Sequence, residues 1–369
     1  MEFTWPESAA SWRQRARRLT EDVLRPLDGE LPPAEGGLPG PLRDRCLEAR
    51  RAAGLWGLAV PAAHGGAGLS WVAHAAVHEE AGGSLLGLDV HGLWSVGEVP
   101  EPLLAAGGGG LQAMLRACLQ GRRQAQQIPL RAAAGLRTEP AGGGAVRASG
   151  VVRDVPAHLA GDVVLVPGAD GATLVLDRDL PGYRVSVPRP SMASGAWVDL
   201  ECSDCLVPAG RVLRGTGAAA SRWEARRRAC VVAAGALGAA RRCLEAALAH
   251  ARTRRTFGQP LGDRQAIQWM LADSARELHA ARMLVYGAAS LADRGGDAAP
   301  AALRARILAT EVACAVADRV LQIHGGYGYA RDLPFERYWR DLRYDRCAEG
   351  APAALAAEDA LRLAEELDA

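Results

Sequence analysis

The most informative segment of this 369-residue chain is Gln322-Ile323-His324-Gly325-Gly326-Tyr327-Gly328-Tyr329, near its end. It follows a helical pattern over residues 303–320 and is rich in glycine, which ends helices and leaves the backbone open to close approach. Alone it is typical of a loop that terminates a helix. Its significance comes from its neighbours, which are Arg254-Arg255-Thr256-Phe257-Gly258, Gln265, Arg340-Asp341 and Glu349-Gly350.

Helical periodicity surrounds this stretch. Apolar residues recur at intervals close to 3.5 residues from 267 to 291 and again from 303 to 320, which predicts two long antiparallel helices of a bundle. The amino-terminal third has a similar pattern, with helices expected near residues 42–53 and 71–81. Segments rich in proline and glycine, such as residues 32–41, separate these helices.

The middle of the chain has a different character. Residues 163–166 and 173–176 are rich in β-branched side chains and are bounded by Gly, Pro and Asp, which predicts two strands joined by a hairpin turn at Asp170-Gly171. We therefore expect an α+β, mainly α fold. Its expected domains are an N-terminal helical domain over residues 1–128, a small middle β-domain over 129–215 and a C-terminal four-helix bundle over 216–369.

Composition and charge narrow the function classes. A formal net charge of +1 gives no electrostatic case for binding nucleic acid or an anionic membrane surface. The longest nearly apolar run, residues 229–240, is too short to span a bilayer. The amino terminus lacks an apolar signal core, and the eight cysteines are scattered, so we expect a cytoplasmic protein with free buried thiols. The chain has no lysine, so every basic contact comes from arginine, whose planar guanidinium suits phosphates.

In their order and spacing, the motifs of the last third resemble the C-terminal domain of the acyl-CoA dehydrogenase family. The succession of helices, small β-domain and four-helix bundle is also the plan of that family. The resemblance implies an FAD flavoprotein, an oxidoreductase acting on CH–CH groups that introduces an α,β double bond into an acyl thioester. No side chain can accept a hydride, so this chemistry requires the flavin.

Glu349 is the predicted catalytic base. In the family the base lies in a Glu-Gly-Thr turn, nine residues after the Arg of an Arg-Asp pair, and Glu349 follows Arg340 at that interval. A glutamate removes an α-proton when a dry, closed site brings its pKa towards the working pH. The resemblance then implies hydride transfer from the β-carbon to flavin N5. Ala351 stands where the family usually has Thr.

A set of cofactor contacts also follows from the resemblance. In relatives, an Arg-x-x-Phe-Gly segment, a nearby Gln and a Gln-x-x-Gly-Gly segment bind the ADP half of the FAD held by the neighbouring subunit. Arginine pairs with phosphate, and adjacent glycines let backbone N–H groups approach it. Thr138, in Thr138-Glu139-Pro140, resembles the flavin-facing Thr at the start of the family's middle domain. The other expected cofactor-binding residues are Arg254, Thr256, Phe257, Gln265, Gln322, Gly325 and Gly326.

The middle domain departs from the family pattern. Glycines 142–144 stand where relatives have a Ser, and aligning Ser149-Gly150 with the family's Asn-Gly places Asp154 where a Trp packs on the flavin ring and Pro156 where a Thr binds the cofactor. Losing hydrogen bonds of about 1 kcal/mol each, and an aromatic contact, would lower flavin affinity by orders of magnitude. Two side chains are candidates to replace the lost contacts, Arg153 and Trp197.

The resemblance also implies partners. The expected substrate is an acyl-CoA or acyl-carrier-protein thioester, and the expected electron acceptor is an electron-transfer flavoprotein. Because each FAD spans two subunits, we expect a homodimer or homotetramer, or a heterotetramer with a related subunit. Two alternatives stay open: a flavin-poor partner subunit of a heteromeric acyl-CoA dehydrogenase complex, and a flavin monooxygenase on the same fold, which the presence of Glu349 disfavours.

Two patterns that resemble metal sites are better explained as structural. Cys202 and Cys205 have the spacing of a zinc or redox pair, but no second Cys/His pair lies near them in the sequence. His74 and His78 lie four residues apart on an expected helix and would share one face, without an evident third ligand. We therefore expect no metal site.

Overall fold

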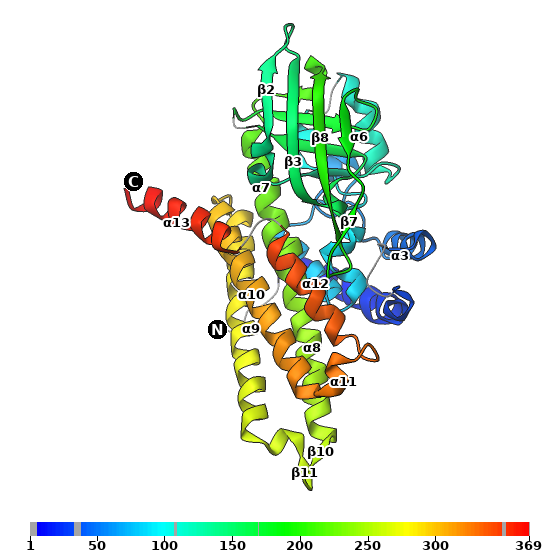
Figure 1. The fold of residues 1–369 in the computed structure, drawn as a ribbon, viewed down its shortest axis with the longest axis vertical. Helices are drawn as coiled ribbons and strands as arrows, with labels where there is room; N and C mark the ends of the chain where they lie inside the picture. Colours follow the sequence, from blue (N-terminus) through cyan, green and yellow to red (C-terminus); the bar gives the residue numbers. More distant parts are fainter. Residues whose placement is uncertain (1–5, 33–37, 107–108, 169, 349–351, 369) are drawn as a thin grey trace.

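The computed structural model describes residues 6–32, 38–106, 109–168, 170–348 and 352–368. The molecule is elongated, with a β-domain at one end, a small hairpin at the other, and long helices running between them (Figure 1). The N-terminal helices pack beside this column, next to its middle (Figure 1). The arrangement confirms the predicted α+β, mainly α fold.

The amino-terminal third is helical, as its apolar periodicity predicted. Its central helix, α4, begins after Ser70, whose hydroxyl accepts a hydrogen bond from the Ala73 N–H at 3.2 Å and caps the helix. Every residue of α4 after Trp71 is buried, so this is a core helix with no solvent face. The helices are α1 (Glu7–Leu19), α2 (Arg25–Leu27), α3 (Gly40–Ala52), α4 (Trp71–Ala81), α5 (Glu101–Ala105) and α6 (Gln112–Leu119).

The β-domain consists of two sheets around their own apolar core. The predicted strands and the turn at Asp170-Gly171 are confirmed: β4 (Val163–Pro167) and β5 (Thr173–Asp177) pair antiparallel, and Gly171 has a φ of +76° that favours glycine. The first sheet has the order β1 (Ala125–Gln127), β4, β5 and β9 (Val212–Leu213), with β1 parallel to β4. The second has the order β2 (Leu136–Pro140), β3 (Val146–Pro156), β8 (Ala196–Val207) and β6 (Tyr183–Val185), and β7 (Arg189–Pro190) also pairs with β8.

The C-terminal part is a helical bundle, and the two long helices predicted from periodicity are its α9 and α10. Glycine allows α8 to contact α4 backbone to backbone, because a Cβ built at Gly238 would lie 1.9 Å from the Glu79 carbonyl oxygen. The elements are α7 (Gly217–Arg226), a π-helical segment (Arg227–Ala233), α8 (Ala234–Thr253), β10 (Arg255–Thr256), β11 (Gln259–Pro260), α9 (Gln265–Asp293), α10 (Ala299–His324), α11 (Gly326–Tyr329), α12 (Phe335–Cys347) and α13 (Pro352–Asp368).

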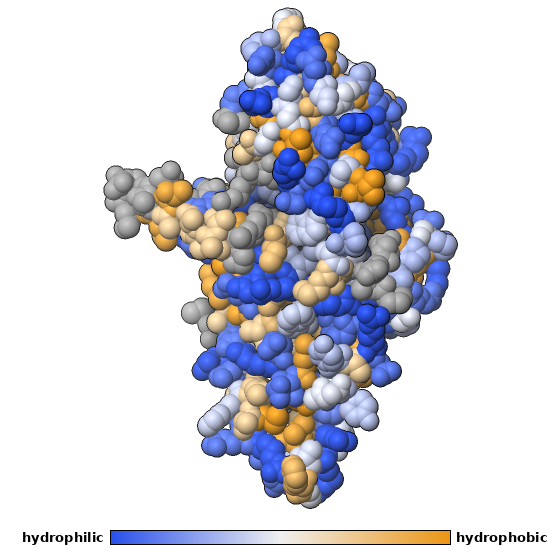
Figure 2. All heavy atoms as spheres, viewed as in Figure 1, coloured by the Kyte–Doolittle hydropathy of each residue, from blue (hydrophilic) through white to orange (hydrophobic). Residues whose placement is uncertain are grey.

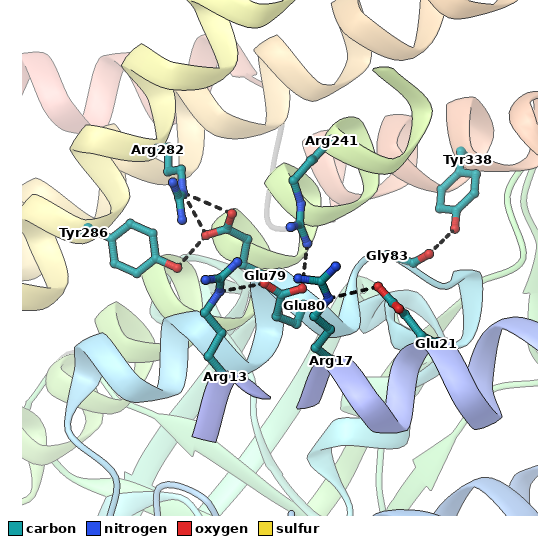
Figure 3. Close-up of polar contacts among 10 residues, drawn as sticks. All are labelled: Arg13, Arg17, Glu21, Glu79, Glu80, Gly83, Arg241, Arg282, Tyr286 and Tyr338. Carbon is teal, nitrogen blue, oxygen red and sulfur yellow. Dashed lines mark hydrogen bonds and ion pairs between the residues drawn. The ribbon is translucent and has the colours of Figure 1, made fainter. Parts of the chain in front are cut away.

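Two adjacent glutamates on α4 join the N-terminal helices to the bundle. Glu80 accepts hydrogen bonds from Arg13 on α1 and Arg241 on α8, at 2.7 and 2.8 Å. Glu79 accepts one from the Tyr286 hydroxyl on α9 at 2.5 Å (Figure 3). A buried carboxylate without partners is strongly destabilising. These contacts therefore explain how a fully buried helix carries two acidic side chains.

Three further features concern the state of the cysteines, clusters of possible metal ligands, and helices that could span a membrane. All eight cysteines are free, and seven of them are buried, including Cys202 and Cys205 on β8. Within the described ranges, no cluster of three or more His, Cys, Asp or Glu side chains is arranged to hold a metal ion. No helix in the described part of the chain is long and apolar enough to cross a membrane.

Candidate active site

The seven C-terminal residues of the predicted ADP grip lie together at one end of the bundle. They occupy the junction of α8 with the β10–β11 hairpin, the start of α9, and the junction of α10 with α11. His250 stacks on His324 with ring centroids 4.4 Å apart, which holds the ends of α8 and α10 side by side. Figure 1 places this end opposite the β-domain. The grip of one chain therefore lies far from the β-domain of the same chain.

The grip end is exposed and conformationally suited to contact another molecule. Phe257 is 99% exposed at the tip of the hairpin, with a φ of +50°. Gly325 has a φ of +62°, and no atom lies within 4 Å of a Cβ built at Gly325 or Gly326, so the backbone there is open. Trp269 and Tyr329 are also largely exposed, and Figure 2 shows hydrophobic atoms at this lower end. Exposed apolar groups gathered in this way are typical of a contact surface.

Thr138 lies elsewhere, on an exposed strand of the β-domain. It is on β2, paired with Ala148 of β3, next to the glycine-rich hairpin turn of residues 141–145. The expected place of this tripeptide, at the start of the domain, is corrected by β1, which precedes it and pairs with β4. Sequence reasoning overlooked β1 because Gln126 and Gln127 are polar, yet both are buried. The structure does not bring Thr138 to the grip of this chain, and its cofactor role stays a prediction.

The residues at the positions predicted to contact the flavin ring differ chemically from those of the family. Asp154, at the position of the family's Trp, has a φ of +53° and a side chain that is 76% exposed and paired with Arg189 at 2.8 Å. Glycines 142–144 have positive φ values and offer no hydroxyl. Trp197, a candidate replacement, packs instead on Tyr344 of α12, with ring centroids 4.8 Å apart. Asp154 and the three glycines therefore offer a flavin no aromatic face, and the Trp197 ring already contacts Tyr344.

Direct contacts join β8 and the segment before it to α12. The Ser194 backbone N–H and hydroxyl donate to Asp341 at 2.7 and 3.0 Å, and the Tyr344 hydroxyl donates to the Ala196 carbonyl at 3.2 Å. A Cβ built at Gly195 would lie 2.8 Å from the Tyr344 ring. The backbone at Gly195 therefore packs directly against α12, and a larger residue would clash there. Burial raises the pKa of Asp341 to about 6, against the hydrogen bonds from Ser194 that lower it.

Glu349, the predicted base, lies outside the described residues, together with Gly350 and Ala351. The last described residue before it is Ala348, which directly follows the end of α12 at Cys347. Its side chain is therefore not placed, and its catalytic role stays a prediction.

A buried polar cluster next to this boundary was not anticipated. Asp89 accepts a hydrogen bond from Arg227 at 2.6 Å, and the same oxygen lies 3.2 Å from His158 Nε2. Burial alone would raise the pKa of Asp89, but Arg227 and His158 hold it well below its usual range. The cluster joins all three parts of the chain, with Arg227 on a π-helical segment of the kind often found at functional sites. An aspartate within the mainly apolar run of residues 85–96 was the available signal.

The residues present fit one half of an FAD molecule better than the other. The exposed, open-backbone end of the bundle suits the ADP half of a cofactor bound to a neighbouring subunit. The residues that the resemblance assigned to the ring offer neither an aromatic face nor the expected hydroxyls. The chain therefore fits FAD as a donor of the ADP grip, and it does not fit the ring through those residues.

Two family descriptions match this chain. Residues 6–112 match the acyl-CoA dehydrogenase N-terminal domain, and residues 214–357 match the acyl-CoA dehydrogenase C-terminal domain. The chain is 36% identical over 195 residues to cyclohexane-1-carbonyl-CoA dehydrogenase of Geobacter metallireducens, a match covering 50% of each chain. It spans about half the length of the first curated relatives it matches. With (R)-benzylsuccinyl-CoA dehydrogenase of Thauera aromatica it shares 29% identity, over 95% of this chain and 94% of the relative.

Solved structures show the same fold over nearly the whole chain. Butyryl-CoA dehydrogenase from Megasphaera elsdenii superposes with a TM-score of 0.82 at 24% identity, covering 98% of this chain and 100% of the other. Another structure of this fold was solved as a complex with FAD. Members of the family are FAD-dependent oxidoreductases that act on CH–CH groups. Two matched domains and an architecture shared from end to end place this chain in the acyl-CoA dehydrogenase family.

Proposed function

We propose that this chain works in an FAD-dependent dehydrogenase that oxidises the α,β carbon–carbon bond of an acyl thioester. Family membership supports the reaction class. The observation that supports the proposal most is that the residues predicted to form the ADP grip, among them Arg254, Phe257 and Gly325, lie at one exposed end of the bundle. The substrate would be an acyl-CoA or acyl-carrier-protein thioester, and an electron-transfer flavoprotein would reoxidise the enzyme.

In this proposal Glu349 removes the α-proton. Its interval of nine residues from Arg340, which lies on α12, supports the role. The Ser194–Asp341 and Tyr344–Ala196 hydrogen bonds hold α12, the last described helix before residue 349, against the β-domain. Bound FAD would supply the acceptor for the β-hydride.

A second form of this function is favoured by the unequal fit of the two FAD halves. A chain that lends its grip to a neighbour, while another subunit carries the flavin ring, keeps Arg254 and Gly325 but has no need of an aromatic group at Asp154. We therefore also propose that the working assembly is a heteromer with a related, ring-binding subunit. A flavin monooxygenase on the same fold is the weaker candidate, because Glu349 is retained.

The decisive experiment is the flavin content of the purified chain, alone and after incubation with FAD, read from the visible spectrum. Near-stoichiometric flavin that bleaches with an acyl-CoA, and fails to bleach in Glu349→Gln, would establish a self-sufficient dehydrogenase. A colourless chain that acquires flavin only when co-purified with a related subunit would establish the heteromer.

The grip supplies the matched control for either form. Arg254→Gln should lower FAD retention in the flavin-containing assembly, whereas Arg276→Gln, at an exposed surface pair on α9, should leave it unchanged. Equal retention in both variants would contradict the assignment of the grip.

A further inference from the structure

A groove lies between the N-terminal helices and the start of α12. Its volume is about 890 Å³, within the range of about 300–1,000 Å³ that is typical of small-molecule sites. Most of its lining comes from three parts of the chain that are distant in sequence, which are residues 21–31, Arg242 on α8 and residues 331–340. None of the residues assigned to the ADP grip lines it. A ligand in this groove would therefore occupy a place separate from the grip.

The groove is lined by charged side chains of both signs. Five arginines and five carboxylates take part, so the formal charge of the lining is balanced. Some of these charges already have partners, and those are not available to a ligand. Glu21 pairs with Arg17 at 3.0 Å, and Glu336 pairs with Arg340 at 2.6 Å. The charges that remain without a partner decide what the groove attracts.

A third carboxylate of the lining, Asp28, is held by neutral donors. It accepts hydrogen bonds from the Ser84 hydroxyl at 2.7 Å and from the backbone N–H groups of Leu85 and Leu86 at 3.1 and 3.2 Å. Burial raises the pKa of Asp28 to about 6, against these hydrogen bonds, which lower it. Its oxygens are thus engaged by the ends of the segments that they join.

Three arginines of the groove have no partner. Arg25 on α2, Arg242 on α8 and Arg331, which follows α11, form no side-chain hydrogen bond or ion pair with any residue that the structure describes. Arg25 and Arg242 are half-buried, and Arg331 is exposed. Three guanidinium groups from separate elements therefore line one groove with their donors unused.

Arg337 on α12 is a fourth guanidinium of the groove that has no carboxylate within 4 Å in the described ranges. It donates to the backbone carbonyls of Leu31 and Pro32, which carry no net charge. Only two carboxylates of the lining, Asp22 and Asp332, are without a partner among the same residues. The unpaired charge of the groove is therefore positive. Guanidinium groups suit phosphate in particular, because they donate to it through two parallel N–H groups.

Two of the free arginines act at the same point of the groove. Arg25 and Arg242 both line a smaller polar hollow of about 50 Å³ as well as the groove, so they lie where the two spaces adjoin. Burial raises the pKa of Tyr338 well above its usual value, and Arg242 and Arg25 both oppose that shift, so both charges act on one hydroxyl of the lining. Arg241, the sequence neighbour of Arg242, is instead held by Glu80 (Figure 3). Arg242 is thus the guanidinium of this turn of α8 that remains available.

The rest of the lining suits a small organic group attached to the phosphate. Inorganic phosphate alone would fill only a small part of the groove. Small-molecule sites typically combine a few polar anchors with apolar walls. The apolar side chains that line this groove are Pro26, Leu31, Leu85, Leu333, Pro334 and the ring of Tyr338.

We infer that this groove binds a phosphate group, carried either by a small phosphomonoester or by inorganic phosphate, with Arg25, Arg242 and Arg331 as its donors. The inference does not rest on the proposed function, because the groove shares no residue with the ADP grip. Binding there requires neither flavin nor turnover.

The test is isothermal titration calorimetry of the full chain with AMP, adenosine and sodium phosphate, at one ionic strength set with sodium chloride. Saturable binding of AMP and none of adenosine is the expected result, because only AMP brings a phosphate to the arginines. Binding of neither AMP nor phosphate, or equal binding of AMP and adenosine, would overturn the inference.

Matched variants link the heat of binding to the groove. Arg242→Gln and Arg331→Gln should each weaken AMP binding by about tenfold, as expected for losing one hydrogen-bonding contact to a charged group. Arg331 is exposed, so its variant tests the site without disturbing the core. Arg276→Gln, at an exposed pair on α9, should leave the dissociation constant unchanged. If all three variants bind AMP alike, the phosphate is bound elsewhere and the inference fails.

Two comparisons then identify the source of the phosphate and exclude the grip. Tighter binding of AMP than of sodium phosphate identifies a phosphomonoester site, and equal binding identifies a site for inorganic phosphate. Arg254→Gln tests whether AMP occupies the ADP grip instead. Loss of AMP binding in Arg254→Gln, with none in Arg242→Gln, would place the ligand at the grip and refute the inference. Because these titrations need no bleaching of a flavin, a failed bleaching assay would refute the proposed function without affecting this result.

Discussion

Replacing Glu80 by Gln should destabilise the protein through the loss of one buried charge between three helices. Glu80 is 3% exposed and receives hydrogen bonds from Arg13 and Arg241 at 2.7 and 2.8 Å (Figure 3). Breaking a fully buried ion pair typically costs about 3–5 kcal/mol. The arginine side chains remain 30% and 33% exposed, so water can solvate them after the change. Gln also keeps one acceptor oxygen, which places the expected cost near 2 kcal/mol.

The measurement is urea unfolding followed by far-ultraviolet circular dichroism at pH 7.5. Glu21→Gln is the matched control, because Glu21 also pairs with an arginine of α1, Arg17, at 3.0 Å, but both side chains are about half exposed. An exposed pair of this kind contributes less than about 0.5 kcal/mol. The reasoning would be refuted if Glu80→Gln and Glu21→Gln shifted the unfolding free energy equally.

The difference in unfolding free energy between wild type and Glu80→Gln should also depend on pH. Burial alone would raise the pKa of Glu80, but Arg241 and Arg13 lower it below its usual value of 4.5. A lowered pKa contributes stability that is present above pH 4.5 and is lost as the pH falls through the folded-state value. The difference between wild type and Glu80→Gln should therefore shrink below pH 4.5, and a difference that grows in acid would contradict the assigned contacts.

Three further predictions follow from individual groups. Burial raises the pKa of Asp341 from 3.8 to about 6. The protonated carboxyl therefore contributes to the stability of the folded state below pH 3.8, and this contribution is lost as the pH rises through 6. Relative to Asp341→Asn, wild type should lose up to about 3 kcal/mol of unfolding free energy between pH 4 and 7, and parallel profiles would contradict this. Phe257→Ser should weaken self-association in sedimentation velocity, whereas Val187→Ser, also largely exposed but on the β-domain, should not. Cys347 should be the first thiol alkylated in native protein, ahead of Cys202, whose pKa burial raises to about 12, as peptide mass spectrometry would show.

The elements that the sequence predicted well are those with a strong local pattern. The periodicity over residues 267–291 matches α9, and the β-branched runs around Asp170-Gly171 match β4, β5 and their turn. In each case burial follows a period that one helix or one hairpin imposes by itself. No knowledge of distant neighbours was needed.

β1 was missed for the opposite reason. Its residues Gln126 and Gln127 are polar but buried, and Gln127 is held by a hydrogen bond to the Ala220 carbonyl on α7 at 2.9 Å. A glutamine satisfied by a helix some ninety residues away leaves no periodic signal in its own segment. Without β1, Thr138 seemed to begin the β-domain, although it lies on the second strand.

The unpartnered donors buried beside α4 also depend on contacts that are distant in sequence. His74, Trp94 and Trp223 come from separate elements, and each is an unremarkable residue in its local context. Their donors become significant only because the fold buries them together without acceptors. A sequence pattern can suggest which residues form helices, but it cannot show which hydrogen bonds remain unmade.

The separation between the ADP grip and the β-domain has a consequence for how this chain could lose one function and keep the other. Because the two lie at opposite ends of the molecule, a cofactor held by both must bridge two subunits. Changes at Asp154 then affect only a flavin ring seated on this subunit, whereas changes at Arg254 affect a flavin seated on its neighbour. A chain that had lost its role altogether would have no reason to keep the second set intact. The retained grip and the altered ring positions together favour a subunit that still serves a flavin site.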